Sequence, residues 1–274
     1  MNRLSLAVIV VALAAAPAAA QGLSKGLRSG GATSSGSGVR QYGSWLDDAS
    51  LLAPGGAWAA ISFGHYRTPG ARQTDFPVVD ASIGLSRRAQ IGITVPYYRV
   101  HFTDGSGLHG LGDVYFNGKF SIIDPDEGDR SLGLSASPVI ELLDRSQSDS
   151  GRFAWGIPVS VEFRGDGYRL FGSTGYFSRG AIFASTAIEV PVTERLVVTG
   201  ALSLMRSLTD VPAADALRIP RSRSDVTAVA AYFLTPSIAL FGGTGRTIST
   251  MGETGTSFLL TGGFSVTFVP SVAP

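Results

Sequence analysis

Period-two alternation of apolar and polar residues recurs from Ala57 to Val269, and it restricts the possible fold more than any other feature of this chain. Successive side chains of a strand point to opposite faces, so such alternation predicts strands with one apolar and one polar face. No helical period persists over the same region, which predicts an all-β fold. The pattern predicts about twelve strands, at residues 57–66, 77–85, 89–102, 111–123, 131–142, 154–164, 167–177, 180–190, 194–206, 224–234, 237–247 and 256–269.

The stretch GLGDVYFNGKF, residues 110–120, raises the question of which face is the inside. Phe116 and Phe120 would share one face of a strand, and Asp113, Asn117 and Lys119 the other. In a soluble sheet the apolar face packs inward. In an outer-membrane barrel it faces lipid, and the polar face lines the interior.

The N-terminal region indicates export. Residues 1–20 carry Arg3, then an apolar run from Leu4 to Ala20 that ends in APAAA, which predicts a secretory signal peptide. The alternative, a membrane anchor, is disfavoured because the run is shorter than the roughly 20 residues needed to span a bilayer. Residues 21–55 are predicted to be a flexible N-terminal segment, and the more apolar part at 42–55 is a candidate plug or constriction.

Composition and connection lengths favour the membrane alternative. The chain has no Cys, which excludes a disulfide scaffold, and only 16% charged residues, against about 25% in soluble domains. A net charge of +1 gives no reason to expect a nucleic-acid partner. Short connections such as TP at 235 alternate with long ones such as that at 207–224, as periplasmic turns alternate with external loops. We therefore predict an up-and-down antiparallel transmembrane β-barrel at residues 56–269, with a C-terminal tail at 270–274 and both ends in the periplasm.

The inward face would collect the polar and charged side chains of the barrel. They are candidates for a solute pathway, and the alternative is a network of paired interior charges, since buried ions are seldom left unpaired. Asp113 and Lys119 lie too far apart along one strand to pair directly, so each needs partners elsewhere. The lumen candidates are Asp80, Asp113, Asn117, Lys119, Glu141, Glu162, Arg164 and Glu189.

A family resemblance adds to this interpretation. The stretch SRRAQIGITVPYYRV, followed by GLGDVYFNGKF, resembles bacterial outer-membrane transporters of the type grouped as the "MetA-pathway of phenol degradation" family. Ile91, Gly92 and Val95–Tyr97 stand in that family's first motif, and Gly110 and Gly112–Val114 stand in its second. The resemblance covers residues 77–123 and implies a barrel that transports a small, hydrophobic or aromatic solute. The ending VPSVAP departs from the terminal aromatic residue that is usual in such barrels.

Two other classes of function stay open at this point. A lipid-hydrolase barrel would need a Ser-His-Asn arrangement, but the Asn residues are Asn2 and Asn117, and only His101, near Asp104 and Ser106, suggests a cluster. We therefore expect no enzyme, no cofactor and no metal site. A structural or lipopolysaccharide-binding barrel is the other alternative, in which arginines around a long external loop would bind phosphates or attract anions. These arginines are Arg206, Arg218, Arg221 and Arg223.

Overall fold

The computed structural model describes residues 39–41, 44–125, 131–142, 153–178, 180–208, 221–249 and 255–270. Within these ranges every regular element is a strand, and none is a helix long and apolar enough to cross a membrane. The predicted signal peptide and residues 271–274 lie outside the described residues. A short hairpin, β1 (Val39–Gln41) and β2 (Ser44–Leu46), precedes the main sheet.

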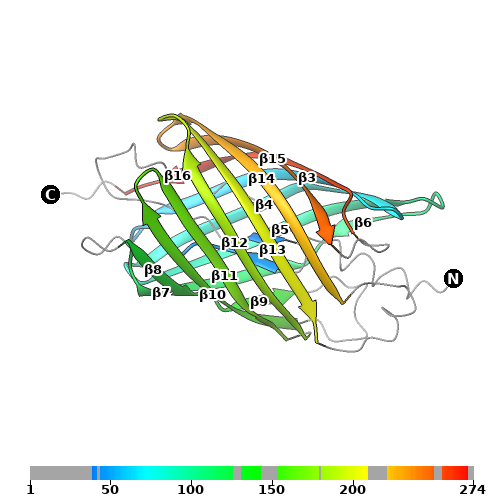
Figure 1. Ribbon diagram of the computed structural model, residues 1–274, viewed down its shortest axis with the longest axis horizontal. Helices are drawn as coiled ribbons and strands as arrows, with labels where there is room; N and C mark the ends of the chain where they lie inside the picture. Colours follow the sequence, from blue (N-terminus) through cyan, green and yellow to red (C-terminus); the bar gives the residue numbers. More distant parts are fainter. Residues whose placement is uncertain are drawn as a thin grey trace.

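The main sheet is a closed antiparallel barrel of strongly tilted strands (Figure 1). The last strand pairs with the first along its whole length, from Phe258 opposite Arg67 to Phe268 opposite Ala57. β6 and β7 are two parts of one barrel strand, as are β8 and β9, so the barrel has 12 strands, as predicted. The bounds are β3 (Ala57–Arg67), β4 (Ala71–Ser86), β5 (Ala89–Phe102), β6 (Gly107–Leu111), β7 (Val114–Ile123), β8 (Leu132–Ala136), β9 (Val139–Leu142), β10 (Phe153–Gly165), β11 (Tyr168–Phe177), β12 (Ala181–Pro191), β13 (Leu196–Ser207), β14 (Ser222–Thr235), β15 (Ile238–Ser249) and β16 (Phe258–Phe268).

The two faces of the wall have opposite chemistry. Phe116, Val159 and Phe264 are 42%, 37% and 43% exposed on the outside, whereas Lys119 and Glu162 are fully buried on the inside. A closed barrel pairs its backbone groups between strands, which lets a sheet with an apolar outer face exist in hydrocarbon. The prediction that the apolar face points outward is therefore confirmed. The wall therefore has the two faces of a transmembrane β-barrel.

The connections divide the barrel into two ends. Two-residue connections at 87–88, 166–167 and 236–237 mark one end, here called the turn end, and the connections at 143–152 and 208–221 mark the other, the loop end. The predicted long connection after the first strand is wrong, because β4 already begins at Ala71 and a short turn at 68–70 precedes it. Gln73 and Asp75 continue the inward-facing row of β4, and Gln73 Nε2 donates to Asp75 Oδ1 at 2.7 Å.

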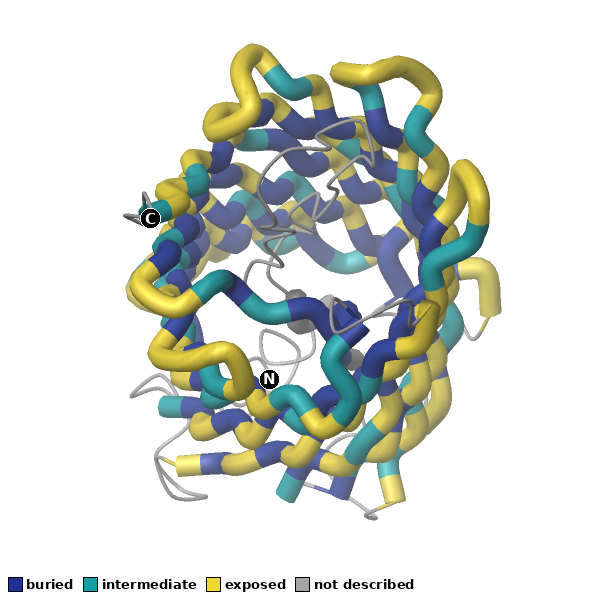
Figure 2. Tube along the Cα trace, turned by 90° about the vertical axis from the view of Figure 1, so that its left-hand side faces the viewer, coloured by how far each residue is buried: buried dark blue, intermediate teal, exposed yellow. Residues whose placement is uncertain are grey.

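A stretch of chain N-terminal to β3 lies within the ring of strands. Figure 2, a view along the barrel, shows buried chain inside the ring. At the turn end, the backbone N–H of Gly55 donates to Gly84 O at 2.8 Å, and that of Gly84 donates to Gly56 O at 2.9 Å. These two bonds attach the beginning of β3 to β4 at the point where the chain comes out of the interior.

Candidate functional site

The candidate site is the contact between the barrel interior and residues 45–52, here called the inner segment. Residues 45–50 are all buried, and β2 lies against β11, β12 and β13. Closer to the turn end, the backbone N–H of Leu52 donates to Gln90 Oε1 at 2.8 Å. The inner segment therefore follows the barrel wall from the turn end inward.

Glycine at position 84 gives the chain room to cross β4. A Cβ atom built on Gly84 would lie 2.6 Å from Leu52 O and would also collide with Ala53 O. Carbon atoms do not approach a carbonyl oxygen that closely without displacing it. The absence of a side chain on Gly84 is thus a local requirement for the position of the inner segment.

Two adjacent carboxylates of the inner segment bind cations of the wall. Lys119 Nζ, on β7, lies 2.9 Å from Asp47 Oδ1 and 2.9 Å from Asp48 Oδ1. Arg169, on β11, donates from Nη1 to Asp48 Oδ2 at 2.9 Å and from Nη2 to Glu189 Oε2, on β12, at 3.2 Å. The inner segment is therefore bound to the wall through charge-assisted hydrogen bonds, which are stronger than neutral ones.

Glu162, on β10, extends this network toward the turn end. Its Oε2 accepts from the backbone N–H of Ala49 at 3.1 Å and from Ser50 Oγ at 2.7 Å, while its Oε1 accepts from Arg164 Nε at 2.7 Å. Arg164 also donates from Nη2 to Ser50 Oγ at 2.7 Å. One buried carboxylate thus binds both a wall cation and the backbone of the inner segment.

The carboxyl group of Asp47 is strongly desolvated. Burial raises the pKa of Asp47 to about 6, although Lys119 lowers it and the adjacent Asp48 raises it further. Asp47 Oδ2 also accepts a hydrogen bond from Ser137 Oγ at 3.2 Å. The ammonium group of Lys119 and the hydroxyl group of Ser137 thus face the two oxygens of this carboxyl group.

An aromatic cluster surrounds the first residue of the inner segment. Trp45 packs with Tyr115, Val139, Phe177 and Phe183, which come from β7, β9, β11 and β12. The next residue of the segment, Leu46, packs in a separate cluster with side chains of β11, β12 and β13. The segment therefore contacts the interior through apolar packing as well as through ion pairs.

Hydroxyl groups of the wall bind the backbone of the inner segment. Ser135 Oγ, on β8, donates to Asp48 O at 3.4 Å, and Ser173 Oγ, on β11, donates to Trp45 O. Each of these bonds gives a hydrogen-bond donor to a buried carbonyl group of the segment.

All of the predicted lumen candidates lie on the interior face, but only some of them meet. Lys119, Glu162, Arg164 and Glu189 join the network with the inner segment. Asp80 accepts from Thr94 Oγ1 on β5 at 2.6 Å instead. The remaining candidates, Asp113, Asn117 and Glu141, are buried inward-facing residues of β7, of β9 or of the break before β7.

Sequence reasoning missed Asp47, Asp48 and Arg169. Arg169 had a usable signal, because it occupies an inward position of a strand between the outward Tyr168 and Leu170. The Asp47–Asp48 pair also stands out inside the apolar stretch YGSWLDDASLLA. Its connection to Lys119 had no signal in the sequence, because the segment has no strand register with β7.

The structure corrects one residue of the predicted external arginine group. Arg223 is an inward-facing residue of β14, 5% exposed, and its Nε lies 2.8 Å from both carboxylate oxygens of Asp225. β14 begins two residues earlier than predicted, which places Arg223 and Asp225 on the same inner face. Arg206 and Arg221 are exposed at the loop end, and Arg218 lies outside the described residues.

The cluster considered for catalysis lies on one exposed turn. Ser106 Oγ donates to Asp104 Oδ1 at 2.6 Å, so the hydroxyl is bonded to the carboxylate within that turn, while His101 is an exposed residue of β5. Asn2 lies outside the described residues. Among the described residues, no group of three or more His, Asp or Glu side chains could hold a metal ion.

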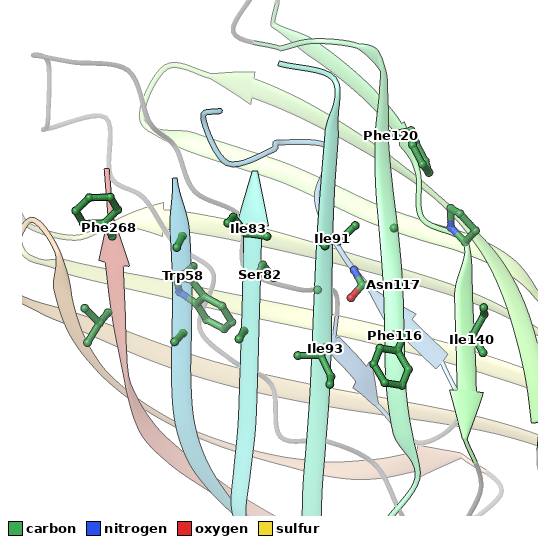
Figure 3. Close-up of a pocket in the computed structure, with 17 residues that line it drawn as sticks. Trp58, Ser82, Ile83, Ile91, Ile93, Phe116, Asn117, Phe120, Ile140 and Phe268 are labelled. Atoms are coloured by element: carbon green, nitrogen blue, oxygen red, sulfur yellow. The ribbon is translucent and has the colours of Figure 1, made fainter. Parts of the chain in front are cut away.

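A separate groove of about 890 Å³ is lined by β16, β3, β4, β5, β7 and β9 (Figure 3). Most of its lining residues belong to the outward apolar rows, among them Ala59, Ile83, Phe116 and Ile140. The groove is therefore a feature of the lipid-facing surface and is distinct from the network inside.

Comparisons with known proteins support the barrel architecture. No family model matches the chain, and no curated protein matches it, so the resemblance to the phenol-degradation family stays a prediction. Among solved structures, the NanC porin matches with a TM-score of 0.54 at 10% identity, over 76% of this chain and 98% of that one. The KdgM porin in complex with disordered oligogalacturonate matches with a TM-score of 0.51 at 8% identity, over 76% and 99%. At such identities the likeness concerns the fold alone, and that fold is a β-barrel which this chain shares with the two porins.

Proposed function

We propose that the protein is an outer-membrane channel for the passive passage of a small solute, and that the inner segment closes it. The observation that carries this proposal is the pairing of Lys119 and Arg169, on the wall, with Asp47 and Asp48, inside the barrel. A channel interior is expected to be polar in such barrels. A chain segment held inside it by ion pairs narrows the path for solute and can be released without unfolding the wall.

The side chains of the interior bear on the class of solute that the channel passes. The family resemblance implies a hydrophobic or aromatic solute, and the aromatic cluster around Trp45 is compatible with one. The ionic and hydroxyl groups that line the rest of the described interior favour a polar solute. We place the polar alternative first, because these groups would have to be desolvated by an apolar solute without compensation.

A reversible covalent lock tests the channel proposal. A Cβ atom built on Gly133 would lie 2.9 Å from Ala49 Cβ. The Cβ atoms of a disulfide are roughly 3.5–4.5 Å apart, so the two positions must separate by about 0.6 Å or more for the bond to form. Pro125 lies equally close to that position and must also shift. Because the chain has no Cys, the double variant Ala49→Cys/Gly133→Cys can form only the intended intramolecular bond.

Conductance of the refolded variant in planar bilayers would be recorded before and after reduction. We expect the oxidised lock to abolish openings and reduction to restore the wild-type current, with Gly133→Cys alone unaffected by either treatment. Equal currents in both states would show that the inner segment does not close the path. If the reduced lock, the wild type and the Asp47→Asn/Asp48→Asn variant all carried no current, that result would contradict a channel.

A further inference from the structure

The inner segment occupies wall groups that suit a particular kind of solute. Asp47 and Asp48 present two carboxylates to Lys119 and Arg169, with every nitrogen–oxygen distance at 2.9 Å. The three distances are typical of charge-assisted bonds between a cation and a carboxylate. A chain segment that must leave for solute to pass is here bound through functional groups that a small acid also carries.

Release of the segment changes the charge of the interior around Lys119 and Arg169. Lys119 loses both of its ion pairs with the segment, and Arg169 keeps Glu189 and Glu162 but loses Asp48. Separating a buried cation from its partner is costly. An incoming anion that bonds to the same nitrogens offsets that cost, whereas a neutral solute does not.

The carboxylates of this network on the wall balance only part of its positive charge. Glu162 accepts from Arg164 at 2.7 Å, and Glu189 accepts from Arg169 at 3.2 Å. On the wall, the network thus has three cations, Lys119, Arg164 and Arg169, and two carboxylates, Glu162 and Glu189. Without the segment, the wall part of the network therefore carries a net positive charge.

A row of hydroxyl groups continues from the cations around the barrel. Ser135 pairs in register with Ser160, Ser160 with Ser173, Ser173 with Ser185, and Ser185 with Ser203, on five neighbouring strands. Ser135 and Ser173 donate to backbone carbonyls of the inner segment. The hydroxyls of Ser160, Ser185 and Ser203 are buried and make no hydrogen bond within the part of the chain that the structure describes.

We infer that Lys119 and Arg169 form a carboxylate-binding site, which Asp47 and Asp48 occupy in the closed channel and a hydroxylated carboxylate occupies when the segment leaves. The inference rests on the proposed function and specifies the solute for it. The carboxylate replaces the aspartates at the two cations. The hydroxyls of the solute bond to the serine row, where the segment now places its carbonyl groups. Solute entry and segment release are then coupled, because both ligands compete for the same atoms.

A matched pair of probes isolates the contribution of the carboxylate. D-Gluconate and D-sorbitol share their chain of hydroxyls and differ in carrying a carboxylate or a neutral CH₂OH group at one end. In bilayers at constant ionic strength, we expect gluconate to raise the open probability of the wild-type channel saturably. Sorbitol at the same concentration should have no such effect.

Variants with a loosened segment separate binding from closure. In Asp47→Asn/Asp48→Asn we expect gluconate to produce resolvable current blocks, and the additional change Lys119→Gln to weaken its apparent affinity about tenfold or more, since a charged hydrogen bond contributes about 1.5–3 kcal/mol. The matched control adds Arg195→Gln, an exposed residue of the 192–195 connection, and should leave the blocks unchanged.

Two results would overturn the inference while leaving the channel intact. One is equal action of gluconate and sorbitol on a conducting protein. The other is an unchanged gluconate affinity after Lys119→Gln in the loosened background. A protein that conducts in neither background contradicts the proposed function instead, so the two failures are distinguishable.

Discussion

Lys119 Nζ lies 2.9 Å from Asp47 Oδ1 across 72 positions of sequence, and both side chains are fully buried. One residue belongs to a barrel strand and the other to the inner segment, so this ion pair connects the wall with the chain inside it. Breaking it should loosen the segment without removing a strand from the barrel.

Substitution of Lys119 by Gln is the direct test of that statement. We expect the free energy of docking to fall by about 3–5 kcal/mol, because Asp47 and Asp48 would remain buried without their ammonium partner. In an Ala49→Cys background, the thiol should become reactive toward a membrane-impermeant maleimide much faster than in the parent. Unchanged labelling, with heat-modifiable barrel mobility preserved on gels, would show that the pair does not hold the segment.

A methyl group at position 84 should displace the inner segment by steric means alone. Gly84→Ala places a Cβ atom 2.6 Å from Leu52 O, whereas the control Gly200→Ala meets no heavy atom closer than 4.0 Å. We expect Gly84→Ala to raise the frequency of channel openings and Gly200→Ala to leave it unchanged. Equal opening frequencies in the two variants would argue that the segment does not pass over β4 as described.

The outer face gives a prediction about stability. Val159→Arg places a charge on the lipid-facing surface, where arginine costs about 2–4 kcal/mol near the bilayer midplane. The free energy of unfolding in lipid vesicles, measured by urea titration, should fall by an amount in this range, and Val159→Leu should change it little. A soluble, detergent-free Val159→Arg protein of unchanged stability would contradict the lipid-facing assignment.

The inner and outer faces of the wall could be predicted from the sequence, because the alternation of apolar and polar residues within one strand is enough to assign its side chains to two faces. Phe116 and Lys119 fall on opposite faces of one strand whatever its neighbours are, and the predicted sides are confirmed. The start of β4 at Ala71 was missed because its first residues, Ala71–Asp75, are mostly polar on both faces. Arg223 was predicted to lie in the external loop because the predicted strand began at residue 224. The observed strand begins two residues earlier, and this places Arg223 in the interior.

The partners within the site could not be predicted in the same way. Asp47 and Asp48 lie outside any regular strand of the wall, so no register relates them to Lys119 or Arg169. Their pairing depends on the path of the chain across the interior, which only the closed barrel defines. The candidate plug at 42–55 was predicted from composition. Its contacts with the wall depend on the three-dimensional path of the chain, which composition does not give.

The bonds of Gly55 and Gly56 with Gly84 hold the chain between the inner segment and β3 against β4. A released segment therefore stays tethered, and its return is an intramolecular step with an effective concentration on the order of millimolar. A competing solute must reach a comparable concentration, scaled by its relative affinity, to keep the path open. When the solute is exhausted, the channel would shut again by itself, with no second protein and no energy source.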